Sequence, residues 1–138
     1  IRTESSMFSV ASNGGPAAGW FMTELGGDAR VKETISISSP FEGAPRARFF
    51  PGVLARDIEP GSALLARLRG ASSAVPHFSI AGGSDRVVPG GALLPHGETL
   101  LVEGAGHNEV LYHPATVAAV VRRIAAMSSG RTAGPRAA

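Results

Sequence analysis

Three polar side chains, far apart along the chain, are of the types that together activate a nucleophile: Ser12, Asp85 and His107. A serine hydroxyl is a weak nucleophile until a base takes its proton, and histidine titrates near neutral pH. A carboxylate beside the histidine fixes one tautomer and stabilises the charged ring. The residue types therefore indicate nucleophilic catalysis. Each residue could instead have a structural role. Ser12 could be an ordinary turn residue, Asp85 could form an Asx turn or cap a helix, and His107 could be a histidine near the start of a helix.

Each of these residues follows a stretch expected to be a strand. The expected strands are 7–10, 31–38, 75–81 and 99–103, and the expected helices are 17–25, 60–68 and 114–127. Strands that alternate with helices over short turns predict an α/β fold with a parallel sheet of about four strands and crossover helices. The carboxyl ends of parallel strands meet at one edge of a sheet. We therefore expect Ser12, Asp85 and His107 to lie at the same edge.

Other segments have structural interpretations. Residues 41–58 are expected to form an irregular, lid-like excursion. Its apolar side chains would either line an acyl-binding cleft or simply pack the loop. The aromatic residues Trp20 and Phe21 are expected in the core, as is the helical stripe Val117, Val120, Val121 and Ile124. Arg122 and Arg123 are expected on a solvated helix face. We expect one domain over 1–127 and a disordered tail over 128–138.

Composition narrows the function classes. The 138 residues carry 13 basic and 11 acidic side chains, so the excess of two charges argues against a dedicated nucleic-acid surface. The chain has no cysteine, which excludes disulfides and cysteine ligands to zinc. The spacing of His107 and His113 does not suit a helical metal pair, and 82–84 lacks the ending of a phosphate loop. We expect no cofactor, no metal, no nucleic-acid partner and no transmembrane segment. The richness in Ala, Gly and Arg suggests a bacterial gene.

Four short motifs, taken together, resemble the α/β-hydrolase superfamily, and in particular its lipase and esterase branch. The turn at 11–15 (ASNGG) resembles the nucleophile elbow, and 38–43 (SSPFEG) resembles the stretch that follows the next strand. The segment 80–89 (IAGGSDRVVP) matches the acid loop, and 104–107 (GAGH) matches the histidine loop. The chain order of serine, acid and histidine is also that of the family. The resemblance runs from about residue 7 to residue 127.

The resemblance implies a carboxylic ester hydrolase with Ser12 as nucleophile, His107 as base and Asp85 as acid. The backbone N–H of Asn13 would stabilise the oxyanion, and the substrate would be a small ester or a lipid. Val10 departs from the glycine that the family elbow has at this position, so we expect a distorted turn or a shifted register. Only 11 residues precede Ser12, and no source of a second oxyanion donor is visible. The chain therefore resembles the C-terminal half of a hydrolase, and the alternative function is a non-catalytic remnant that binds or forms homo-oligomers without turnover. The sequence indicates no particular compartment.

Overall fold

The fold alternates short strands with helices along the chain. The computed structural model describes residues 6–71, 73–90, 93–94 and 96–130. The strands are β1 (Ser6–Ala11), β2 (Val31–Ile37), β3 (His77–Gly82) and β4 (Glu98–Val102). The helices are α1 (Gly14–Glu24), α2 (Val53–Asp57), α3 (Ala63–Gly70), α4 (Glu109–Tyr112) and α5 (Pro114–Ser128), with 3-10 turns η1 (Gly27–Ala29) and η2 (Pro45–Phe49).

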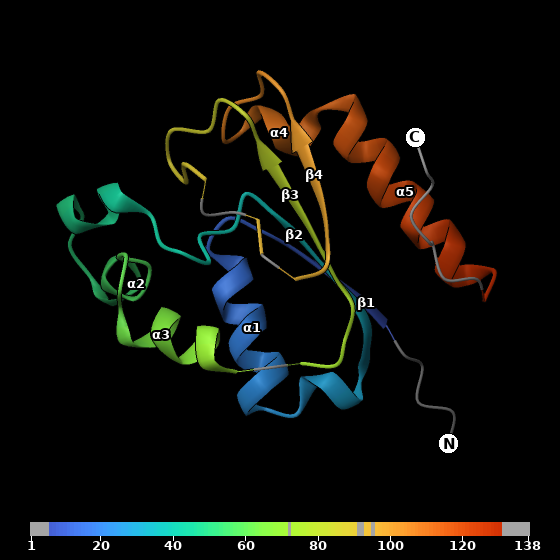
Figure 1. Cartoon of the computed structure of the whole chain (residues 1–138), viewed down its shortest axis with the longest axis horizontal. Helices are drawn as coiled ribbons and strands as arrows, with labels where there is room; N and C mark the ends of the chain where they lie inside the picture. The colour runs from blue at the N-terminus through green and yellow to red at the C-terminus, as the bar shows by residue number, and fades with distance from the viewer. Residues whose placement is uncertain (1–5, 72, 91–92, 95, 131–138) are drawn as a thin grey trace.

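The four strands form one parallel sheet in the order β1-β2-β3-β4, as predicted. Ala11 pairs with Ile37, Ile37 with Ile80, and Ile80 with Leu100. The strands therefore end nearly level with one another, and the loops that follow them lie along one edge of the sheet (Figure 1). This edge is where the candidate site residues were expected.

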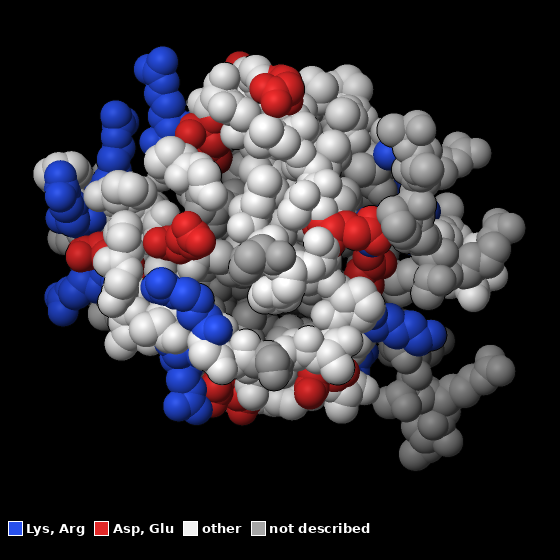
Figure 2. All heavy atoms as spheres, viewed as in Figure 1, with Lys and Arg blue, Asp and Glu red and all other residues white. Residues whose placement is uncertain are grey.

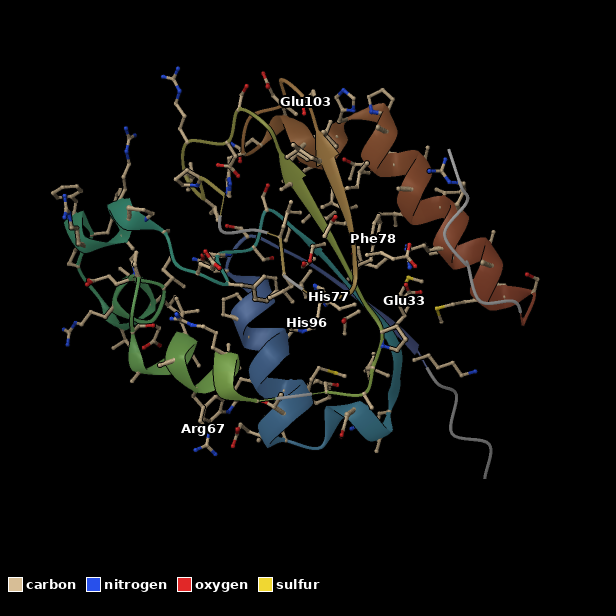
Figure 3. The ribbon with its side chains drawn as sticks, in the orientation of Figure 1. Glu33, Arg67, His77, Phe78, His96 and Glu103 are labelled. Carbon is tan, nitrogen blue, oxygen red and sulfur yellow. The ribbon has the colours of Figure 1, made fainter. Side chains whose placement is uncertain are left out.

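The two faces of the sheet differ in chemistry. Helices α4 and α5 cover one face, and α1 and α3 lie on the other (Figure 1). The α5 face is apolar, and the buried residues that pack together there are Ile35, Ile37, Phe78, Ile80, Val102, Ala105, Val110 and Ala119. Figure 3 shows Phe78 and Glu33 toward α5, while His77 and His96 lie toward α1. Side chains of neighbouring strand positions point to opposite faces, which is why Phe78 and His77 separate in this way.

Helix α5 buries a different face from the one that its apolar stripe predicted. Val117, Val121 and Ile124 are half-exposed, whereas Thr116, Ala119 and Arg123 are buried. Of the predicted stripe, Val120 does pack against the core. The buried Arg123 is paired with Glu33 of β2 and Glu98 of β4, and its guanidinium lies 3.9 Å from the centre of the Phe78 ring. Two carboxylates and an aromatic ring thus compensate the buried charge, so the prediction of a solvated face was wrong for Arg123.

The excursion after β2 is more regular than predicted, because it contains η2 and α2. Ala44 and Ala47 pack against Ala81 and Val88 beside the end of β3. Four of its larger apolar side chains are at least 65% exposed, namely Phe49, Phe50, Val53 and Leu54, whereas Phe41 and Ile58 are partly buried. Lys and Arg side chains gather on the same side of the molecule (Figure 2). Alanines and Ile58 therefore anchor the excursion, and its middle presents four bulky residues to solvent.

Helix boundaries follow local signals. Ser62 caps α3, since its hydroxyl accepts a hydrogen bond from the Leu65 N–H at 3.2 Å. Helix α5 begins with Pro114, which needs no N–H partner in the first turn. This helix continues through Ser128, and most of the expected tail, 131–138, lies outside the described residues. None of the described helices has the length and hydropathy of a membrane span.

Candidate active site

Ser12 occupies a tight turn between β1 and α1. Its φ is +48°, a left-handed conformation that costs a non-glycine residue roughly 1–2 kcal/mol. Two backbone hydrogen bonds hold the turn: the Ser12 N–H donates to the Ile37 carbonyl at 3.0 Å, and the Ser12 carbonyl accepts from the Gly15 N–H at 3.1 Å. The strained conformation lifts the serine out of the strand at the carboxyl edge of the sheet. Backbone strain of this kind is concentrated at functional sites.

Val10 does not disturb the turn in the way expected from its size. It pairs with Ser36 in regular register, and the only irregularity between the described parts of β1 and β2 lies at Ser6/Met7. Gly14 leaves the space that Val10 needs, because a Cβ atom there would lie 3.1 Å from the Val10 Cβ. Thus the glycine at one end of the turn makes room for a residue with a Cβ atom at the other.

Asp85 lies in the loop after β3 and is almost completely buried. One carboxylate oxygen, Oδ1, accepts hydrogen bonds from the N–H groups of Val87 and Val88 at 2.8 and 2.9 Å. Burial raises the pKa of the Asp85 carboxyl, but hydrogen bonds from Val88, His107 and Val87 lower it, and the net pKa lies below the ordinary value. The carboxyl group is therefore ionised at neutral pH, with Oδ2 left for another partner.

That partner is His107, whose Nδ1 lies 2.8 Å from Asp85 Oδ2. An ionised carboxylate only accepts hydrogen bonds, so we assign the proton to Nδ1 of the imidazole. Nε2 then has a free lone pair, and it lies 3.2 Å from the Ser12 hydroxyl oxygen. The structure thus brings Ser12, His107 and Asp85 into one hydrogen-bonded series. This arrangement can move a proton from the serine to the imidazole while the carboxylate balances the new charge.

The loops that carry Asp85 and His107 are joined to each other by their backbones. The Ser84 N–H donates to the Ala105 carbonyl at 3.0 Å, and the Gly83 N–H donates to Val102 at 2.8 Å. Gly82 must lack a side chain, because a Cβ there would lie 2.4 Å from the Ala105 oxygen. These contacts fix the acid and the imidazole relative to each other.

Two residues near the series were not singled out from the sequence. Glu109 accepts a hydrogen bond from the Gly106 N–H at 2.8 Å and so fixes the histidine loop, a capping role that its position just after the loop could have suggested. Ser38 ends β2 with a φ of +47°, the same left-handed conformation as Ser12, and its buried hydroxyl has no partner among the described residues. Its only sequence signal is the Ser-Ser-Pro stretch after a strand.

The backbone at Asn13 offers a hydrogen-bond donor beside Ser12. Asn13 is the N-cap residue of α1, and within the described chain its N–H donates to no protein acceptor. The start of an 11-residue helix carries a partial positive charge. A negative oxygen formed next to Ser12 would therefore meet both a free donor and a favourable dipole.

An open groove of about 770 Å³ leads away from Asn13. Its sides come from α1, α2 and α3, and its larger apolar residues are Trp20, Leu54, Ile58 and Leu64. Trp20 is 38% exposed here, so the prediction that it belongs to the core was wrong. From the excursion, Leu54 and Asp57 of α2 and the following Ile58 line the groove, whereas Phe41, Phe49, Phe50 and Val53 do not.

The remaining histidines lie apart from this series. His77 is held between strand hydroxyls, and His113 caps α5 by accepting the Ala115 N–H at 3.2 Å. Across the described residues, no three His, Asp or Glu side chains are grouped closely enough to hold a metal ion.

Comparison with solved structures finds several similar folds at low sequence identity. A monoacylglycerol lipase from Paleococcus ferrophilus aligns over 88% of this chain and 66% of its own, with a TM-score of 0.58 and 14% identity. BpoC from Mycobacterium tuberculosis H37Rv, proposed to be a non-heme bromoperoxidase, covers 88% and 67%, with a TM-score of 0.60 and 16% identity. The carboxylesterase Cest-2923 from Lactobacillus plantarum WCFS1 covers 98% and 62%, with a TM-score of 0.54 and 18% identity.

The chain thus spans about two thirds of the length of these structures. No protein-family model and no curated protein matches the sequence. At these identities the comparisons establish the fold alone.

Proposed function

We propose that this chain, which has the α/β-hydrolase fold, belongs to a serine hydrolase that cleaves carboxylic esters. The observation that carries the proposal is the series of hydrogen bonds from Ser12 through His107 to Asp85 at the carboxyl edge of the sheet. Each residue comes from a different loop, and each loop follows a strand. The lipase and the carboxylesterase among the structural neighbours support ester cleavage.

In the proposed reaction Ser12 attacks the ester carbonyl while its proton passes to Nε2 of His107. Asp85 stabilises the imidazolium through Nδ1, and the Asn13 N–H donates to the oxyanion. When the carbon–oxygen bond to the alcohol breaks, His107 gives its proton to the leaving alcohol. Water then attacks the acyl-enzyme, His107 takes a proton from that water, and Ser12 recovers a proton as the carboxylic acid leaves.

The substrate class follows from the groove beside Asn13. Its apolar walls suit an extended acyl chain, whose burial is favourable in proportion to the apolar area removed from water. Asn13, the chain neighbour of Ser12, is one of the residues that line the groove, so an acyl chain bound there would lie beside the proposed nucleophile. We therefore expect esters with medium-length apolar acyl chains to be preferred over acetates.

Covalent labelling with a fluorophosphonate tests the proposal. The wild-type chain should take up the label on Ser12, and Ser12→Ala should abolish labelling while circular dichroism stays unchanged. Labelling of another serine, or no labelling of a folded wild type, would overturn the assignment. Ser9→Ala is a suitable control, since Ser9 is an exposed serine on the same strand.

The second candidate is a protein of this fold that binds or self-associates without turnover. Its support is Val10, which departs from the glycine of the family elbow. It predicts a folded wild-type chain that resists the fluorophosphonate. Sedimentation velocity would then show whether the chain is a dimer.

A further inference from the structure

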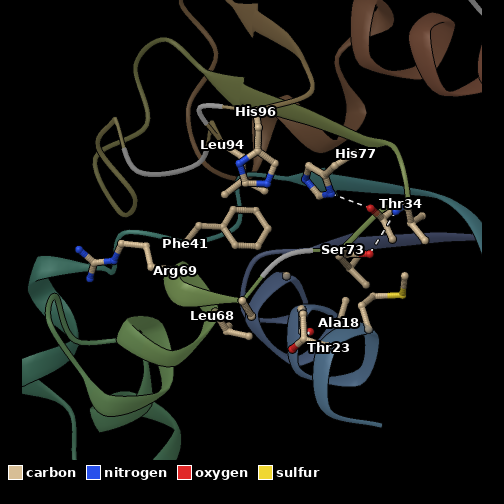
Figure 4. A pocket seen from close by; sticks show the side chains of 16 residues that line it. Ala18, Thr23, Thr34, Phe41, Leu68, Arg69, Ser73, His77, Leu94 and His96 are labelled. Carbon is tan, nitrogen blue, oxygen red and sulfur yellow. Dashed lines mark hydrogen bonds between the residues drawn. The ribbon is translucent and has the colours of Figure 1, made fainter. Parts of the chain in front are cut away.

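A second, more enclosed cavity lies under the sheet, on the side of α1 and α3. It measures about 190 Å³, and Figure 4 shows the side chains that surround it. Val10 and Gly15 border it, but Ser12, Asp85 and His107 do not line it. This cavity is therefore separate from the hydrogen-bonded series and from the groove beside Asn13.

The floor of the cavity is unusually polar for a buried parallel sheet. Parallel strands covered on both faces are normally apolar throughout. Here Ile35 and Ile37 face α5, whereas Thr34 and Ser36 face α1 and bond to His77. Thr34 Oγ1 lies 2.6 Å from Nδ1 of His77, and Ser36 Oγ lies 2.9 Å from Nε2.

The floor is polar without being charged. Burial of His77, with a further contribution from His96, lowers the pKa of its imidazole to about 4. Both ring nitrogens already have partners, so His77 holds the two hydroxyl groups in place. An oxygen with two lone pairs keeps one of them available, which leaves Thr34 able to accept a hydrogen bond from a ligand.

The walls of the cavity are mainly apolar and partly aromatic, and their polar members are Thr23, Arg69, Ser73 and His96. Ala18 and Met22 come from α1, Leu68 from α3, and Phe41 from the start of the excursion. The Phe41 ring meets His77 edge-on, with 5.6 Å between the ring centres and an angle of 84° between the planes. A mainly apolar lining with a few polar groups is typical of small-molecule sites.

We propose that this cavity binds a small, neutral aromatic alcohol, with the ring among Phe41, Leu68 and Met22 and the hydroxyl donating to Thr34. The size is suitable, because apolar cavities of roughly 150 Å³ already bind benzene. A ring would make edge contacts with Phe41 like those that Phe41 makes with His77. A charged ligand is disfavoured, since most lining residues are apolar and the ionisable Arg69 and His96 are exposed residues that do not belong to the floor.

Titration of the wild-type chain with phenol and with toluene tests this site without using ester turnover. Methyl resonances of Met22, Leu68 and Leu94 report the location, and calorimetry gives the affinity. Phenol should bind in the millimolar range, as expected for so few non-hydrogen atoms, and roughly three- to tenfold more tightly than toluene. Thr34→Val should remove that preference, whereas Thr99→Val, an exposed position outside the lining, should retain it.

Substitutions that fill the cavity provide a second test of the proposed site. Ala18→Leu should weaken phenol binding at least about tenfold, and Ala71→Leu offers another lining position if the helix does not tolerate the change. Ala66→Leu, on the exposed side of α3, should have no effect. The proposal is overturned if phenol fails to bind, if the filled variants bind it as wild type does, or if the shifted methyl groups lie elsewhere. A chain that binds phenol but resists the fluorophosphonate would lose only the proposed hydrolase function.

Discussion

Asp85 Oδ2 lies 2.8 Å from His107 Nδ1, and the other oxygen of the same carboxylate accepts two backbone N–H groups. The carboxylate thus has two separate roles, one that shapes its own loop and one that orients the imidazole. A substitution that keeps the first role and removes the second can therefore distinguish them.

Asp85→Asn should make this separation. The amide oxygen can still accept from Val87 and Val88, but the neutral side chain no longer fixes the tautomer of His107 or stabilises its charge. We expect the rate of fluorophosphonate labelling to fall about 10²- to 10⁴-fold with little change in thermal stability. Asp28→Asn, an exposed position, is the control. A full labelling rate in the Asp85 variant would contradict the proposed orienting role.

His77 should make the protein less stable as the pH falls. Its pKa is about 4 in the folded chain and about 6.5 when unfolded, so the unfolded state takes up the proton first. The free energy of unfolding should therefore decrease from pH 6.5 toward pH 4, by about 3 kcal/mol in all. Urea titrations at several pH values measure this. The pKa of Asp85 is lowered from 3.8, so its loss of stability begins only in more acidic solution.

Replacing His77 isolates that contribution. His77→Gln retains hydrogen bonds to the strand hydroxyls but has no proton to gain, so the slope between pH 6.5 and 4.5 should flatten. Thr99→Val, an exposed position that gains no proton, should leave the slope unchanged. An equal slope in wild type and His77→Gln would show that other groups produce the dependence.

The contact between Val10 and Gly14 predicts a reciprocal pair of substitutions. Gly14→Ala places a Cβ 3.1 Å from that of Val10 and should destabilise the chain by roughly 1–3 kcal/mol. Val10→Gly removes the Cβ that the new side chain meets, so Val10→Gly together with Gly14→Ala should be less destabilised than the sum of the two single changes, a coupling that a double-mutant cycle by urea unfolding would measure. Gly70→Ala meets no neighbouring atom within 4 Å and is the control. Simple additivity of the two changes would contradict the steric explanation.

The groove beside Asn13 predicts a dependence on acyl-chain length. Ala17 is an exposed lining residue of the groove on α1, and Ala17→Phe should obstruct it. We expect kcat/KM for an octanoate ester to fall roughly tenfold, a loss of about 1.4 kcal/mol, with little change for the acetate ester. Ala66→Phe adds the same volume outside the groove. Equal losses for both esters would exclude the groove as the acyl site.

The buried Arg123 predicts a large loss of stability when its charge is removed. Arg123→Met leaves Glu33 without its partner in a buried setting, which typically costs 3–5 kcal/mol. Arg122→Met, on the exposed side of the same helix, should change the free energy of unfolding by no more than about 0.5 kcal/mol. Chemical denaturation of the two variants gives the comparison.

The strands and the parallel sheet were predictable from the sequence because short apolar runs and glycine-rich turns are local signals. Which face of α5 is buried was not predictable. Residues 116, 119 and 123 recur at the same helical spacing as 117, 120 and 124, so periodicity alone cannot decide which face is buried. The decision rests on Glu33 and Glu98, which are remote in sequence and make burial of Arg123 acceptable.

The candidate site was likewise predictable only in part. The positions of Ser12, Asp85 and His107 after strands follow from local patterns, but their contact depends on the level register of the strand ends. Trp20 and the groove were not predictable, because exposure of a large aromatic residue depends on how α2 and α3 approach α1. The cavity that Thr34 lines had no signal in the sequence other than the polar residues inside a strand that is buried.

The direct backbone bonds between the Ser84 and Ala105 loops have a practical consequence for protein engineering. The loops that carry Asp85 and His107 are hydrogen-bonded to each other, whereas Ser12 lies on a separate turn with a strained backbone. Heating should therefore misalign the serine before it separates the other two. Efforts to improve heat tolerance are best directed at the junction of β1 and α1.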